Sequence, residues 1–78
     1  MKKDEMTIKE FAKLANTTPR TLKYYESMDL FHPLRIEDNG YRIYSIYQLD
    51  EIASIQLLQS NGLSLQEIKG YLEKNYYC

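Results

Sequence analysis

Apolar residues recur along much of the chain at the three- and four-residue spacing of an amphipathic helix. One such stripe lies near the start of the chain: Ile8, Phe11, Ala12 and Ala15. Another lies near its end: Leu65, Ile68 and Leu72. Together with the segments between them, these patterns predict four helices, at about residues 8–15, 19–28, 46–60 and 65–74.

Each predicted helix is preceded by residues that can cap it. In a capping box, a Ser or Thr hydroxyl accepts from the backbone three residues on, and the side chain there reaches back. Three helix starts have this arrangement: Thr7 with Glu10, Ser45 with Gln48, and Ser64 with Glu67. The remaining start, Thr18-Pro19, offers Thr as N-cap and Pro at the first helical position, where no N–H is needed.

The periodicity changes to two between the second and third helices. Two short strands, 34–36 and 41–44, flank a turn that ends in Asn39-Gly40, a pair that favours the positive φ angles of a hairpin. Strand alternation predicts two faces for this hairpin. Leu34 and Ile36 are expected on one face with Ile43, and Arg35, Arg42 and Tyr44 on the other.

The first two helices are separated only by Asn16-Thr17, and Asn tolerates the left-handed backbone of a tight turn. A close helix pair followed by a hairpin predicts a mainly α winged helix-turn-helix. We expect this fold to have about four helices and a two-stranded β-hairpin wing, in a single domain over residues 1–78.

Composition agrees with a small globular domain, with 44% apolar and 27% charged residues. No apolar stretch approaches the roughly 18 residues that span a bilayer, and the charged N-terminus lacks the pattern of a signal peptide. The lone cysteine, Cys78, gives no disulfide framework. We expect a cytoplasmic protein without membrane contact.

Residues arranged for catalysis are missing from the sequence. His32 is the only histidine, and there is neither a glycine-rich phosphate loop nor a metal-ligand spacing. The neighbouring carboxylates, such as Asp50-Glu51, suit a solvated surface. We expect no enzyme activity, no cofactor and no metal.

Basic and aromatic residues interleave on the second predicted helix. Arg20, Lys23 and Tyr24 share one face, at i, i+3 and i+4, and Leu22 and Tyr25 point to the core. Such a face suits a DNA major groove, although a merely solvated face has the same pattern. On the wing, Tyr41 and Arg42 are placed to hold phosphates, or alternatively to pack as an aromatic–cation cluster. The candidate DNA-binding residues are Thr18, Arg20, Thr21, Lys23, Tyr24, Tyr41 and Arg42.

The overall charge argues against nucleic acid, since 10 basic and 11 acidic residues give −1. Residues 9–42 carry six basic and five acidic residues, whereas 45–78 carry two and four. A DNA-binding surface therefore depends on local placement of charge rather than on its total.

Several motifs together resemble the N-terminal domain of MerR-type transcription regulators over roughly residues 6–73. They are residues 7–16 (TIKEFAKLAN), 20–26 (RTLKYYE), 29–31 (DLF), 39–44 (NGYRIY), 48–49 (QL) and 61–68 (NGLSLQEI). Two positions depart from the family pattern. Lys23 stands where the family usually has Arg, which loses the bidentate fork, and Asp29 stands where it often has Gly.

The resemblance implies a dimer on a near-palindromic operator, in a promoter that the regulator bends so that RNA polymerase can use it. It also implies a long dimerisation helix and an effector domain after this one. Neither is in this chain, so we expect the chain alone to be a monomer. Two alternatives remain: an excisionase-like DNA-architectural protein and a protein-interaction module.

Overall fold

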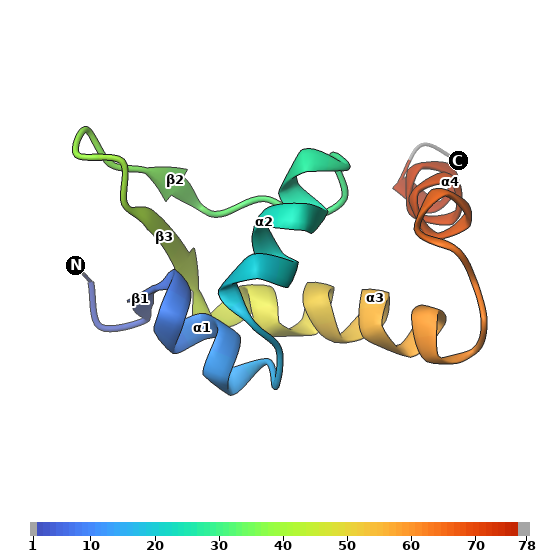
Figure 1. Ribbon diagram of the computed structural model, residues 1–78, viewed down its shortest axis with the longest axis horizontal. Helices are drawn as coiled ribbons and strands as arrows, with labels where there is room; N and C mark the ends of the chain where they lie inside the picture. Colours follow the sequence, from blue (N-terminus) through green and yellow to red (C-terminus); the bar gives the residue numbers. More distant parts are fainter. Residues whose placement is uncertain (1, 77–78) are drawn as a thin grey trace.

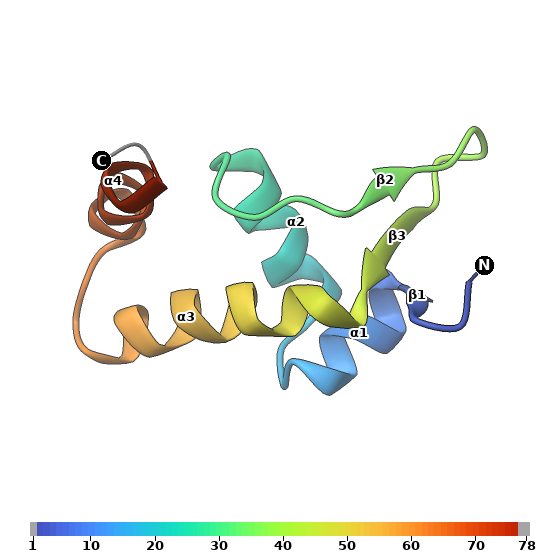
Figure 2. The same ribbon diagram turned by 180° about the vertical axis from the view of Figure 1, so that it is seen from behind.

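The computed structural model describes residues 2–76, and the side chains up to Glu73. Figure 1 shows α1 and the wing at one end, α4 at the other, and α2 between them above α3; Figure 2 shows the same order from behind. None of the described helices is both long and apolar enough to cross a membrane. The elements are β1 (Glu5–Thr7), α1 (Ile8–Leu14), α2 (Pro19–Ser27), β2 (Arg35–Ile36), β3 (Arg42–Ser45), the 3₁₀ turn η1 (Ile46–Gln48), α3 (Leu49–Ser60) and α4 (Leu65–Tyr76).

All the predicted helix caps form. The Thr7 hydroxyl accepts from the Glu10 N–H at 3.3 Å, and the Glu10 carboxylate accepts from the Thr7 N–H at 2.9 Å. Ser64 and Glu67 exchange the same two bonds at 3.2 and 2.8 Å. The box at Ser45 also forms, but the helix that follows begins with the turn η1 before it becomes α3.

Both helices of the helix-turn-helix end on a residue in the left-handed region, Asn16 at φ 56° and Asp29 at φ 57°. After α1 the Thr17 N–H donates to the Ala12 carbonyl at 2.8 Å, and after α2 the Leu30 N–H donates to the Tyr25 carbonyl at 2.9 Å. This six-residue closure defines a Schellman motif. Asp29 therefore holds the position for which Gly is the easiest residue.

Three aromatic rings form the centre of the core. The ring centroid of Phe11 lies 4.8 Å from that of Tyr44 and 5.8 Å from that of Phe31, with all three rings nearly parallel. They join α1, the loop after α2, and β3. Other buried side chains around them are Met6, Leu22, Tyr25, Ile52, Ile55 and Ile68.

The sheet has three strands, where the sequence predicted two. The additional strand, β1, pairs with β3, so that the order is β1-β3-β2 and all neighbours are antiparallel. Its three residues include one buried side chain, Met6, and are too few to show a period of two. The predicted two-stranded wing forms from β2 and β3, whereas β1 was not predicted because it is defined by pairing with a strand far along the chain.

The predicted faces of the wing hold for β3 but were wrong for β2. Ile36 lies opposite Arg42, and Arg35 lies opposite Ile43, so Ile36 shares a face with Arg42 rather than with Ile43. The cause is the length of the loop between β2 and β3. The Glu37 N–H donates to the Tyr41 carbonyl and the Gly40 N–H to the Glu37 carbonyl, with only Gly40 at positive φ.

This loop has three residues, whereas a two-residue Asn-Gly loop would place Ile36 opposite Ile43. One extra residue moves every side chain of β2 to the other face. Leu34 and Ile36 are accordingly about half exposed, while Ile43 is buried.

An ion pair spans the sheet on the face of Ile43. Arg35 on β2 donates to both carboxylate oxygens of Glu5 on β1, at 2.9 and 2.8 Å, and also to Glu37 at 3.2 Å. The Glu5 side chain is only 6% exposed. The bonds from Arg35 lower the pKa of Glu5 from 4.5 to about 2.

We expect this pair to make folding stability depend on pH. Because the pKa of Glu5 is lower in the folded state, the unfolded state binds the extra proton on acidification. The contribution of Glu5 is therefore fully present above about pH 5 and is lost as the pH falls towards 2. Urea unfolding between pH 2 and 7 should show the wild type and Glu5→Gln differing most at neutral pH and converging near pH 2. A constant difference across this range would contradict the assignment.

Candidate nucleic-acid interface

Helix α2 has one exposed and one buried face, as predicted. Arg20, Lys23 and Tyr24 are exposed. Leu22 and Tyr25 are buried, and the Tyr25 hydroxyl donates to Gln59 on α3 at 2.6 Å. The core thus anchors α2 and leaves its polar face available to a partner.

The two threonines at the start of α2 are occupied within the helix. The Thr18 hydroxyl accepts from the Thr21 N–H at 3.1 Å and donates to the Thr21 hydroxyl at 3.0 Å. Thr18 is therefore first an N-cap. Because Pro19 has no N–H and the Thr21 N–H is bonded to Thr18, a ligand at this end would meet the N–H of Arg20.

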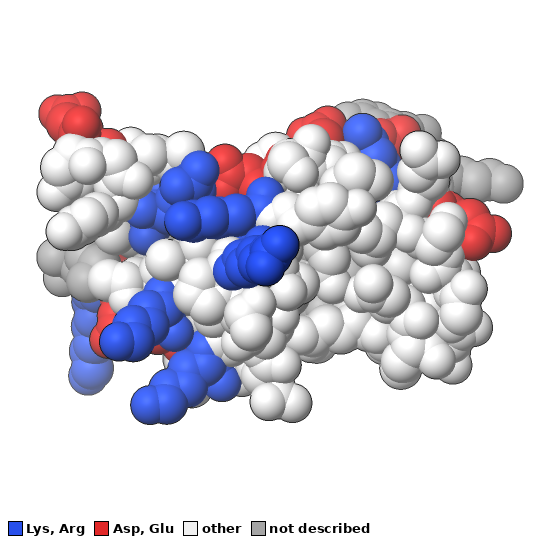
Figure 3. Space-filling model, viewed as in Figure 1, with Lys and Arg blue, Asp and Glu red and all other residues white. Residues whose placement is uncertain are grey.

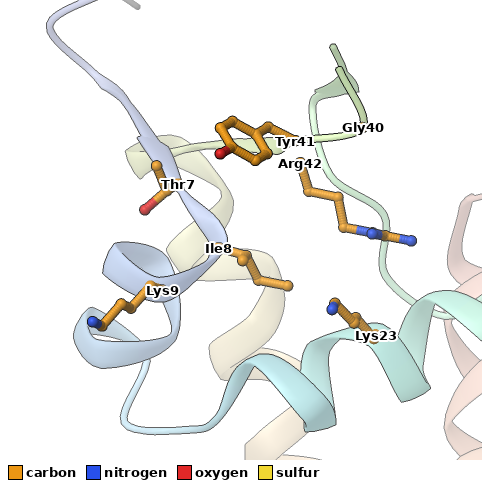
Figure 4. A pocket seen from close by; sticks show the side chains of 7 residues that line it. All are labelled: Thr7, Ile8, Lys9, Lys23, Gly40, Tyr41 and Arg42. Atoms are coloured by element: carbon orange, nitrogen blue, oxygen red, sulfur yellow. The ribbon is translucent and has the colours of Figure 1, made fainter. Parts of the chain in front are cut away.

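A hollow of about 380 Å³ separates α2 from the wing. The structure brings Lys23, Tyr41 and Arg42 together around it, while Thr18, Arg20, Thr21 and Tyr24 lie outside its lining. Figure 4 shows Lys23 approaching from α2, while Tyr41 and Arg42 leave the wing in opposite directions. The other lining residues are Thr7, Ile8, Lys9 and Gly40.

Arg42 is hydrogen-bonded to α2. Its Nε donates to Glu26 Oε1 at 2.8 Å, and its Nη2 lies 3.4 Å from Glu26 Oε2. The bond from Glu26 raises the pKa of the Arg42 guanidinium above its usual value. The alternative, in which Arg42 packs with tyrosine rings as an aromatic–cation cluster, does not form. The Tyr44 ring stacks in the core, and Tyr41 is 67% exposed.

Positive charge gathers on the side of the molecule that carries this hollow. In Figure 3 lysines and arginines gather over α1, α2 and the base of the wing, with acidic residues at the wing tip and beside them, while the part over α3 is mostly uncharged. A net charge near zero therefore coexists with a basic face, as local placement requires.

Sequence reasoning missed two residues of this region. Lys9 lines the hollow from α1, and Glu26 holds Arg42 from α2. Glu26 follows Tyr25 in the motif and is three residues from Lys23, but its partner is 16 residues away. A local pattern gives no sign of that pairing.

His32 lies apart from the hollow, in an exposed pair. Its Nε2 is 2.6 Å from Asp29 Oδ1, and Lys69 of α4 is 3.7 Å from the other oxygen of Asp29. These contacts link the loop after α2 to α4. Within the described residues, no three side chains that bind metals come together.

Comparison with known proteins identifies relatives along nearly the whole chain. The model of the MerR HTH family of regulatory proteins matches residues 6–75. Two regulators from Bacillus subtilis, of multidrug-efflux transporters 2 and 1, are each 39% identical, over 86% and 88% of this chain. The match covers 24% and 25% of those proteins, so the chain spans about a quarter of their length.

Solved structures share the fold with a TM-score of 0.78. One is a MerR-family regulator from Bacillus cereus, 32% identical, matched over 87% of this chain and 51% of that one. Another is the N-terminal part of the Bacillus subtilis multidrug transporter activator MtaN, 33% identical, matched over 86% and 63%. A third, HiNmlR, is 25% identical over 88% and 55%, lacks the sensor domain, and was solved bound to promoter DNA. These structures confirm a winged-helix domain with a mainly helical fold.

Proposed function

Because the chain belongs to the MerR family of helix-turn-helix regulatory proteins, a non-enzymatic family, we propose that it binds double-stranded promoter DNA by sequence. The observation that carries this proposal is the exposed face of α2, with Arg20, Lys23 and Tyr24 beside the basic hollow of the wing. The promoter complex of HiNmlR supports it.

In this proposal α2 enters the major groove and the wing lies over the neighbouring backbone. Arg20, near the start of the helix, pairs with bases, for which the guanidinium fork is suited. Lys23, Tyr41 and Arg42 contact phosphates around the hollow, and the Arg20 N–H, in the first turn of α2 after Thr18, is offered to another phosphate. Thr21 and Tyr24 complete the helix surface.

The whole protein acts, in the same proposal, as a pair of such domains on a near-palindromic operator in the cytoplasm. It distorts the promoter so that RNA polymerase can use it. The family resemblance supports these parts, since the matched relatives are regulators about four times as long as the matched segment. The domain over residues 1–78 is then the DNA-reading part.

We expect binding to a selected duplex to weaken steeply with salt, since each phosphate neutralised adds about 0.9 to the slope of log affinity against log salt.

Arg20→Ala should cost about 1–3 kcal/mol of binding free energy on that duplex and little on unrelated sequences, because a base contact carries sequence preference. The measurement is fluorescence anisotropy at several salt concentrations, with a duplex first selected from a randomised library.

Lys13→Gln is the matched control, since it removes one exposed positive charge outside α2 and the wing. It should leave the sequence preference unchanged. An affinity that does not respond to salt would reject DNA binding and favour a protein-interaction module. Strong binding without sequence preference would instead favour an excisionase-like architectural role.

A further inference from the structure

The bond between Glu26 and Arg42 is the only direct polar contact between α2 and the wing among the bonds of the described side chains. Glu26 is 21% exposed and Arg42 29%, so water screens the pair incompletely. The contact joins the two elements that meet DNA in the proposed mode. It also places an acidic residue on a face where a phosphate is expected.

The bond to Glu26 leaves one edge of the Arg42 guanidinium free. Nε and Nη2 of Arg42 face Glu26, and Nη1 has no hydrogen-bond partner within residues 2–73. A guanidinium carries five N–H donors in a fixed plane, so one edge can be held while another meets a ligand. Arg42 lines the hollow together with Lys23.

We propose that Glu26 is a positioning residue for DNA binding: it holds Arg42 so that the free edge of the guanidinium is presented to a backbone phosphate beside α2. This inference rests on the proposed function. Glu26 does not itself contact DNA; it acts through Arg42 and fixes the wing relative to the recognition helix.

The physical reason is the entropy of a long side chain. Immobilising a flexible side chain on binding costs about 0.5–1.5 kcal/mol. A guanidinium already held by a carboxylate has lost that freedom before DNA arrives. The opposite effect is electrostatic, since the Glu26 charge repels a nearby phosphate. Positioning therefore predicts that removing Glu26 weakens binding, whereas simple repulsion predicts that it strengthens binding.

The change in DNA affinity caused by Glu26→Ala distinguishes positioning from repulsion. We expect DNA affinity to fall about 2- to 12-fold, which is the cost of immobilisation converted at 1.4 kcal/mol per tenfold. The salt slope should become shallower by up to about 0.9, as the Arg42 phosphate contact loosens. Glu26→Gln, whose amide oxygen can still accept from Nε, should recover part of the loss. Fluorescence anisotropy with the selected duplex measures the affinity and the salt slope of the wild type and of both variants. The measurements are made at a temperature where circular dichroism shows each variant folded.

Two controls separate positioning from charge and from folding. Asp38→Asn removes the same charge from the exposed wing turn without breaking a bond of the described residues, and it should bind as tightly as wild type or slightly more tightly. In an Arg42→Ala background, Glu26→Ala should cost nothing further, because its action runs through Arg42.

Tighter binding by Glu26→Ala, or an equal loss with and without Arg42, would overturn the inference. Both results leave the proposed function intact, provided that the wild type binds with a steep salt dependence. If the wild type does not bind DNA, it is the proposed function that fails.

Discussion

Phe11→Ala is expected to lower the free energy of unfolding by about 3–5 kcal/mol, the usual cost of removing a buried Phe ring. Phe11 is fully buried and stacks on both Phe31 and Tyr44. Its loss opens a cavity where α1, the loop after α2, and β3 meet. A domain of this size has a total stability of only about 4–12 kcal/mol, so much of the protein should unfold at moderate temperature.

Urea unfolding followed by circular dichroism measures this effect. Leu14→Ala is the control on the same helix, since Leu14 is 58% exposed and should change stability by about 0.5 kcal/mol or less. A cost below about 1 kcal/mol for Phe11→Ala would mean that the three rings are not the centre of the core. DNA binding should fail in parallel with unfolding, because α1 supports α2.

Joining two copies of the domain should increase affinity for a two-half-site duplex about 10²- to 10⁴-fold over one copy. The gain comes from effective concentration and needs no new contact. Half-sites one helical turn apart have centres about 34–36 Å apart. The longest extent of the domain is 33 Å, which lets two copies lie at that spacing. A Gly/Ser linker of about 40 residues has an average span of roughly 35 Å and fits the distance.

The tandem protein is compared with the single domain on duplexes with one and with two half-sites. On one half-site the two proteins should differ only about twofold, the statistical advantage of two copies. Arg20→Ala in one copy of the tandem should lower the affinity for two half-sites by about 5- to 150-fold, which is its cost of about 1–3 kcal/mol. A gain below tenfold would contradict a palindromic operator read by two such domains, and sedimentation of the single domain would show whether it already pairs.

Local interactions were the part of this protein that sequence patterns predicted well. The capping boxes at Thr7, Ser45 and Ser64 form because donor and acceptor are three residues apart, and helix geometry alone brings them together. The left-handed turn at Asn16 follows from its side chain and short spacing. The two faces of α2 follow from the helical period, so Arg20 and Lys23 are exposed while Leu22 is buried.

The sheet and the wing contact were decided by tertiary structure. Strand β1 exists because it pairs with β3, about 38 residues away, and three residues are too few to signal a strand. The wing faces depended on one loop residue, since a three-residue loop exchanges the positions of Arg35 and Ile36 relative to Ile43.

Local sequence patterns were thus sufficient to predict the helices, their ends and the exposed basic face of α2, because each depends on residues within one or two helical turns. The contact between Arg42 and Glu26, and the position of Lys9 at the same hollow, depend instead on how the elements pack together. Residues of β1, α1, α2 and the wing meet there, and their distances depend on how the whole core packs. A pattern along the chain carries periodicity but no information about those distances.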